Sequence, residues 1–96
     1  MSMLTVDKFI ELSKLNITKE DITGKSRKEE VAIAREIYWY CLNTQGFGYR
    51  RISRLDGRCK QTILSGIRTV KNLIETNHSL IKPYKNIIDI FASTAI

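Results

Sequence analysis

The sequence is poor in the residues that interrupt helices and in those that bind metals. One Pro and five Gly among 96 residues leave no linker-like or low-complexity segment, so we expect a single domain covering residues 1–96. A zinc site is not expected, because the chain has one His and its two Cys residues, Cys41 and Cys59, lack the spacing of zinc ligands. We therefore expect no bound metal and no cofactor, with both thiols free.

Long apolar runs and strand patterns are also missing. No stretch approaches the length of a membrane span, and the first residues do not combine a charged start with an apolar segment as secretory signals do. No run of alternating apolar and polar residues between turn signals indicates a strand. The sequence therefore predicts an all-α protein of the cytoplasm that does not associate with membranes.

Helical periodicity is present throughout the chain. Residues 26–29, Ser-Arg-Lys-Glu, form a capping box that predicts a helix starting at Arg27. Its apolar arc continues to Leu42 and is so wide that little except Glu30, Arg35 and Glu36 is left for solvent, as in a central core helix. Further helices are expected at about residues 5–16, 18–24, 49–55, 60–76 and 83–91, which gives a compact bundle of about six helices.

Two of these expected helices lie next to each other with only a short turn between them. In the first, Ile52 and Leu55 should face inward, and Asp56-Gly57 is a turn signal. The second has an apolar stripe, and its opposite face carries Lys60, Gln61, Ser65, Arg68 and Asn72. Such side chains can reach base edges, which favours a helix-turn-helix at about residues 49–76. From this stretch alone, an ordinary amphipathic core helix explains the pattern equally well.

Positive charge is concentrated in the middle of the chain. The whole sequence has 16 basic and 10 acidic residues and a net charge of +6. Residues 25–71 contain eleven basic and four acidic residues, a net charge of +7, and seven of the eleven are Arg. Arg presents a planar fork of donors that suits phosphates and guanine edges, so this block favours a polyanionic partner.

The motifs of the central block resemble a known family. Its residues Ser26-Arg27-Lys28, Ala34-Arg35, Gly46-Phe47, Ile52-Ser53-Arg54-Leu55 and the run DGRCKQTILSGIRTV from Asp56 are similar to the C-terminal DNA-binding domain (domain IV) of the bacterial replication initiator DnaA. That family's signature reads roughly GGRDHTTVLHAVRKI. The resemblance implies a helix-turn-helix fold of the Trp-repressor-like superfamily. It also implies binding to double-stranded DNA, with a recognition helix in the major groove and an Arg in the adjacent minor groove.

Residue by residue, the resemblance places Arg27 in the minor groove and Arg35 on a phosphate. Arg58 and Thr62 match signature positions at the start of the recognition helix. The family's base-reading Asp-His-Thr is replaced here by Cys-Lys-Gln at residues 59–61, and a later His by Ser65. Since Lys suits guanine and Gln suits adenine, we expect a preference for different bases.

Together these arguments predict a set of DNA-binding residues and a biological role. The chain has no phosphate-binding loop, so we expect control of replication or transcription without ATPase activity, and no small-molecule substrate. His78 lies in a polar break and is better explained as a helix-end residue than as a catalytic base, so we do not expect an enzyme. A homodimer or protein partner would add affinity, and the protein should be associated with the nucleoid. The predicted DNA-binding residues are Lys25, Arg27, Lys28, Arg35, Arg50, Arg51, Arg54, Arg58, Lys60, Gln61, Thr62, Ser65 and Arg68.

A second interpretation stays open on the sequence alone. The chain could be a helical interaction or oligomerisation module that has kept this fold and lost DNA binding. Tyr38, Trp39 and Tyr40 form an aromatic group on the central helix, and an exposed Trp39 would suit a protein partner. Burial of all three in the core is the other explanation of the group.

Overall fold

The described part of the chain is helical, as the sequence predicted. The computed structural model describes residues 6–13, 18–24 and 29–94, and these residues contain helices and turns but no strand. None of their helices is both long and apolar enough to cross a bilayer. In chain order the elements are α1 (Val6–Ser13), α2 (Lys19–Thr23), α3 (Glu29–Thr44), α4 (Tyr49–Asp56), α5 (Lys60–Glu75), the 3-10 helix η1 (Ser79–Tyr84) and α6 (Lys85–Thr94).

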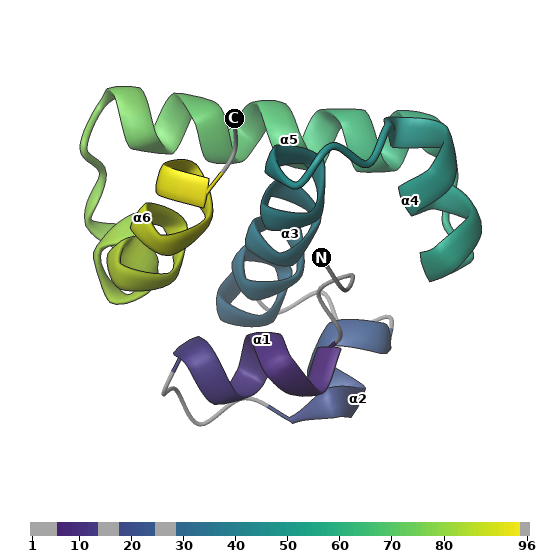
Figure 1. Cartoon of the computed structure of the whole chain (residues 1–96), viewed down its shortest axis with the longest axis horizontal. Coiled ribbons are helices and arrows are strands. Elements are labelled where there is room, and N and C mark those ends of the chain that lie inside the picture. The colour runs from purple at the N-terminus through teal and green to yellow at the C-terminus, as the bar shows by residue number, and fades with distance from the viewer. Residues whose placement is uncertain (1–5, 14–17, 25–28, 95–96) are drawn as a thin grey trace.

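Helix α3 lies at the centre of the fold, which confirms its prediction as the core helix. It contacts α2, α4, α5 and α6. Figure 1 shows α5 running across α3, with α4 at the N-terminal end of α5 and α6 near its other end. Helix α1 packs against α2 and α6 on the far side of α3 from α5. The arrangement leaves α4 and the start of α5 at one edge of the molecule.

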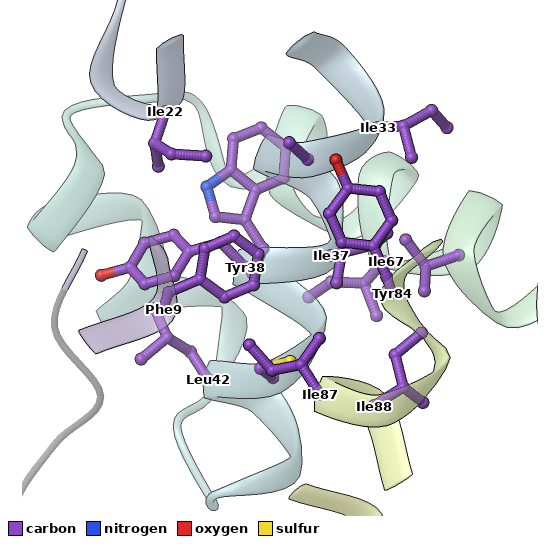
Figure 2. Close-up of a cluster of buried hydrophobic side chains, with 14 of the residues drawn as sticks. Phe9, Ile22, Ile33, Ile37, Tyr38, Leu42, Ile67, Tyr84, Ile87 and Ile88 are labelled. Atoms are coloured by element: carbon purple, nitrogen blue, oxygen red, sulfur yellow. The ribbon is translucent and has the colours of Figure 1, made fainter. Parts of the chain in front are cut away.

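The core is formed by apolar residues that four-residue and three-residue spacings bring onto the inner face of each helix. Phe9 of α1 meets Tyr38 of α3 edge to face, with ring centroids 5.4 Å apart, and both are buried (Figure 2). Ile87 and Ile88 of α6 close the core from another side. Trp39 is only 3% exposed, so it belongs to the core and is not a surface anchor.

Breaks between the helices fall where turn residues predicted them. Helix α3 ends at Thr44, and Gly46 follows with φ 101°, a conformation that disfavours side chains. His78 caps η1, where its Nδ1 accepts a hydrogen bond from the Leu80 amide at 3.1 Å, which confirms its helix-end role. The prediction that Pro83 lies in the first turn of the last helix is wrong. Pro83 lies within η1, and α6 begins after that 3-10 turn has ended.

Several predicted helix ends cannot be compared with the structure. The Thr5 cap, the end of the first helix near Asn16 and the start of the core helix at Arg27 lie outside the described residues. The short second helix is described, and the amide of Gly24 donates to the carbonyl oxygen of Glu20 at 2.7 Å. This bond closes α2 at the glycine where the sequence predicted its end.

Candidate nucleic-acid interface

A tight turn joins α4 to α5. Gly57 follows α4 with φ 68°, in the left-handed region, and its amide donates to the carbonyl oxygen of Ser53. The Ser53 hydroxyl also donates to the carbonyl oxygen of Arg58. Cys59 then precedes the first residue of α5, without a side-chain cap. These hydrogen bonds therefore join Ser53 of α4 to the two residues that follow the helix.

Helix α5 has two distinct faces. Its buried stripe consists of Ile63, Gly66, Ile67 and Val70. The opposite side carries exposed residues at spacings of four, three and four, namely Gln61, Ser65, Arg68 and Asn72, with exposed Lys60 and Thr62 on either side of this line. The polar face predicted from the sequence is therefore presented to solvent along the first three turns of the helix.

Helix α4 exposes its arginines but turns differently from the prediction. Arg50, Arg51 and Arg54 are exposed, and Ile52 is fully buried as expected. The prediction that Leu55 faces inward is wrong, because 52% of Leu55 is exposed. Asp56, four residues after Ile52, occupies the inward direction instead, and its side chain is 8% exposed.

The net positive charge of the protein comes from these two helices and the segments next to them. Residues 45–74 contain seven basic residues and one acidic residue, a net charge of +6, which equals the charge of the whole chain. The single acid is Asp56, which faces inward. The Arg51 guanidinium lies 4.4 Å from the centre of the Phe47 ring, which holds it against the surface. Within residues 45–74, the surface therefore has exposed basic groups and no exposed acidic group.

Asp56 is the centre of a partly buried network. Its Oδ2 accepts a hydrogen bond from Trp39 Nε1 at 3.2 Å and another from Arg58 Nε at 2.5 Å. The Arg58 guanidinium also lies over the Trp39 ring, 5.6 Å from its centre. The carboxylate is satisfied by two donors, which explains why an acidic side chain can point into the protein at this position.

Two arginines that the sequence assigned to DNA bind the end of α2. Arg35 is 7% exposed, and its Nε donates to the carbonyl oxygen of Ile22 at 3.1 Å. Arg58 Nη2 donates to the carbonyl oxygen of Gly24. A helix end has unsatisfied carbonyl groups and a partial negative charge, so cations are stabilising there.

This arrangement changes the expectation for both arginines. Burial of Arg35 contradicts its prediction as a solvent residue and does not fit the predicted phosphate contact, so we leave it out of the proposed interface. The Arg58 side chain is 17% exposed and engaged with Asp56 and Gly24. Arg58 therefore makes contacts within the protein, in addition to the DNA contact predicted for it. Lys25, Arg27 and Lys28 lie outside the described residues.

Three participants in this region were missed by sequence reasoning. Asp56 was interpreted only as a turn residue, and Trp39 as a core or surface aromatic without a polar partner. A Cβ added to Gly66 would lie 2.7 Å from two carbons of the Trp39 ring, so this glycine allows α5 to approach α3 closely. Its place in the apolar stripe of α5 was the available signal for such an approach.

The two thiols differ in environment, and both are free. Cys41 is buried, and burial raises the pKa of its thiol to about 12. Cys59 is exposed at the start of α5, beside Lys60. Among the residues that the structure describes, no group of His, Cys, Asp and Glu could hold a metal ion.

The comparison with known proteins adds one relative. The chromosomal replication initiator protein DnaA of Pseudothermotoga lettingae is 34% identical to this chain over 67 residues. The match covers 69% of this chain and 15% of that protein, so the chain spans a small part of its relative. No protein-family model and no solved structure matches the chain. Over about two thirds of its length, the chain is thus similar to part of a replication initiator.

Proposed function

We propose that this protein binds double-stranded DNA selectively through α4, the turn and α5, acting as a helix-turn-helix with α5 in the major groove. The observation that supports this most is the face formed by α4 and the first turns of α5, which exposes Arg50, Arg51, Arg54 and Lys60 and no acidic group. Phosphates would be neutralised by these basic side chains. A surface evolved only for solubility would carry a mixture of both signs.

Base reading is assigned to the exposed line of α5. Lys60 and Gln61 are in its first turn, and Ser65 and Arg68 follow on the same side. Lys and Arg can donate to guanine O6 and N7, and Gln can pair with adenine N6 and N7. Because recognition helices contact bases with their N-terminal residues, the first two positions should contribute most to selectivity.

The segment of residues 25–28 is the second proposed contact. It holds Lys25, Arg27 and Lys28 and immediately precedes α3. An Arg in the minor groove responds to the width and potential of the groove, which are most favourable in A·T-rich sequence. We therefore assign Arg27 to an A·T-rich flank beside the sequence that α5 contacts.

The biological role that we propose is control of replication or transcription by DNA binding, without catalysis. Support comes from the similarity to a replication initiator and from a proposed interface made of recognition groups. The interaction-module alternative assigned a protein partner to an exposed Trp39. That tryptophan is buried and bonded to Asp56, so the alternative has lost the anchor on which it relied.

Binding of duplex DNA at a series of salt concentrations tests the proposal. If about four to six phosphates are neutralised, log K should fall with log salt at a slope of about −4 to −5, at roughly 0.9 per phosphate. Selection from a random duplex pool should then return a common core sequence beside an A·T-rich flank. A chain that binds no duplex at low salt, or binds with a slope near zero, does not have the proposed function.

A further inference from the structure

Asp56 lies where the turn before α5 meets the core helix. Its Oδ2 accepts a hydrogen bond from Trp39 Nε1 of α3 at 3.2 Å and another from Arg58 Nε at 2.5 Å. Arg58 lies two residues before α5, and its Nη2 donates to the carbonyl oxygen of Gly24, directly after α2. One carboxylate therefore connects the turn to α3 and, through Arg58, to the end of α2.

Trp39 extends these contacts to the body of α5. A Cβ added to Gly66, in the second turn of α5, would lie 2.7 Å from two carbons of the Trp39 ring. Gly66 directly follows Ser65, which lies on the exposed line of α5 one turn after Gln61. The side chain that bonds to Asp56 therefore also sets how closely the second turn of α5 approaches α3.

These contacts are shielded from solvent. Trp39 is 3% exposed, and the side chains of Asp56 and Arg58 are 8% and 17% exposed. Water and salt therefore screen the pair of Asp56 and Arg58 less than they screen a surface pair. The network should stay formed at the salt concentrations at which DNA binding is measured.

We infer that Trp39 and Asp56 are positioning residues, which set the orientation of α5 so that its exposed line can read bases. This inference rests on the proposed function. A hydrogen bond to a base edge requires its donor and acceptor to be aligned within about 0.5 Å, whereas phosphate contacts by flexible Arg and Lys side chains tolerate small changes of angle. Loosening the network should therefore lower the selectivity between sequences and keep non-selective binding.

Trp39→Phe tests the inference because it removes the Nε1 donor and part of the ring that meets Gly66, and keeps every charge. Affinities are measured for the duplex sequence that selection with the wild type returns and for an unrelated duplex of the same length. The ratio of the two affinities should fall about 5- to 20-fold, within the range for the loss of one aligned base contact. The affinity for the unrelated duplex and its salt slope should stay the same, because the basic side chains are unchanged.

The affinity ratio separates positioning from a role in stability alone. A variant that is partly unfolded binds every duplex more weakly by the same factor, so its ratio does not change. Ile87→Val, a small deletion in the core on α6, is the control, which should lower the free energy of unfolding and keep the ratio. If Ile87→Val lowers the ratio as much as Trp39→Phe does, the effect is not specific to the network and the inference is overturned.

Asp56→Asn is the second variant, and it replaces Trp39→Phe if circular dichroism shows that Trp39→Phe is unfolded. Asn keeps an acceptor for Trp39 Nε1 and loses the charge that holds Arg58. Its affinity ratio should fall as well. Its affinity for the unrelated duplex should not fall, because a negative charge has been removed beside the basic side chains of α4 and α5.

The wild-type protein supplies a measurement that needs no variant. Trp39 is the single tryptophan of the chain and is buried, so its fluorescence reports on this network. Because the contacts are present before DNA binds, the emission maximum should be the same in the free protein and in the complex with the selected duplex. A shift to longer wavelength on binding would mean that Trp39 becomes hydrated and the network opens, which overturns the inference.

The remaining outcomes distinguish the inference from the proposed function. An unchanged affinity ratio in a folded variant overturns the inference, as does an equal loss of affinity for both duplexes. A wild type that binds no duplex, or binds all duplexes alike, defeats the proposed function itself, and that outcome is visible before any variant is made.

Discussion

At the scale of single residues, the exposed polar groups of α4 and α5 should fall into two sets. One set should read base edges, and the other should contact the phosphates of the DNA backbone. Gln61 is exposed in the first turn of α5, and Arg54 is exposed on α4. We expect Gln61→Ala to cost about 1–3 kcal/mol on the preferred site and to relax selectivity at one base pair. Arg54→Ala should weaken binding to all sequences alike, because phosphates carry no sequence information.

Selection from a random duplex pool with each variant measures this division. The sequence recovered with Arg54→Ala should match the wild type, whereas Gln61→Ala should tolerate several bases at one position. If selection with Gln61→Ala returns the wild-type sequence with an equally strong preference at every base pair, the first turn of α5 does not read bases through this side chain.

Glu36 gives a prediction about pH and stability. Burial raises the pKa of the Glu36 carboxyl above its ordinary value of 4.5, and the charge of Arg35 opposes part of the rise. The folded state therefore favours the protonated form. The stability associated with that proton is complete below pH 4.5 and is lost as pH rises through the higher pKa of the folded protein.

Glu36→Gln imitates the protonated carboxyl, so it should raise the midpoint of thermal unfolding at pH 7. The advantage over the wild type should shrink with falling pH and vanish below the unfolded pKa. Glu75→Gln makes the same change of charge at an exposed position of α5 and serves as the control. A Glu36 variant that is no more stable than the wild type at pH 7 would show that the buried charge carries no cost.

The exposure of a side chain in the site was predictable where its position on a helical face alone determines it. Gln61, Ser65 and Arg68 lie opposite the apolar stripe of α5, so their exposure followed from spacing. The inward turn of Arg35 did not follow from spacing, because its partner is a carbonyl thirteen residues away in another helix. Asp56 displaced Leu55 from the inner side of α4 for a similar reason, since its donors, Trp39 and Arg58, become neighbours only after folding.

At the scale of helices, the crossing of α3 and α5 depends on a glycine. A Cβ on Gly66 would lie 2.7 Å from the Trp39 ring and 3.0 Å from Glu36 Cγ. Gly66→Ala should therefore lower the free energy of unfolding by about 1–3 kcal/mol through overpacking, although Ala favours a helix by about 1 kcal/mol over Gly. Urea denaturation measures the difference.

The neighbouring exposed position provides the control for this substitution. Ser65→Ala gains helix propensity without a new contact, so it should be neutral or slightly stabilising. If Gly66→Ala proves stabilising as well, α3 and α5 have room to separate, and the close approach at Trp39 is not required.

Helices were easier to predict than the connections between them. Wide apolar arcs and glycine breaks mark α3 and its neighbours, because these signals are local in sequence. The 3-10 helix at Ser79–Tyr84 was missed, since Pro83 is compatible with the first turn of an α-helix and the local pattern does not separate the two.

At the scale of the whole molecule, charge and shape agree on one binding side. The net charge of +6 lies within residues 45–74, and the remaining residues hold nine basic and nine acidic groups. Helix α4 and the start of α5 form one edge of the fold, away from α1 and α6 (Figure 1). A polyanion should therefore be attracted to this edge in preference to the rest of the surface.

Alkylation of Cys59 by a maleimide in the presence and absence of duplex DNA tests this account most directly. Cys59 is exposed at the start of α5, whereas Cys41 is buried with a thiol pKa of about 12 and should not react in the folded protein. At a free duplex concentration about ten times the Kd, we expect the alkylation rate of Cys59 to fall about tenfold by mass action, and to recover at high salt. An alkylation rate that stays unchanged on a duplex to which the protein is shown to bind would place the DNA on another surface and contradict the account.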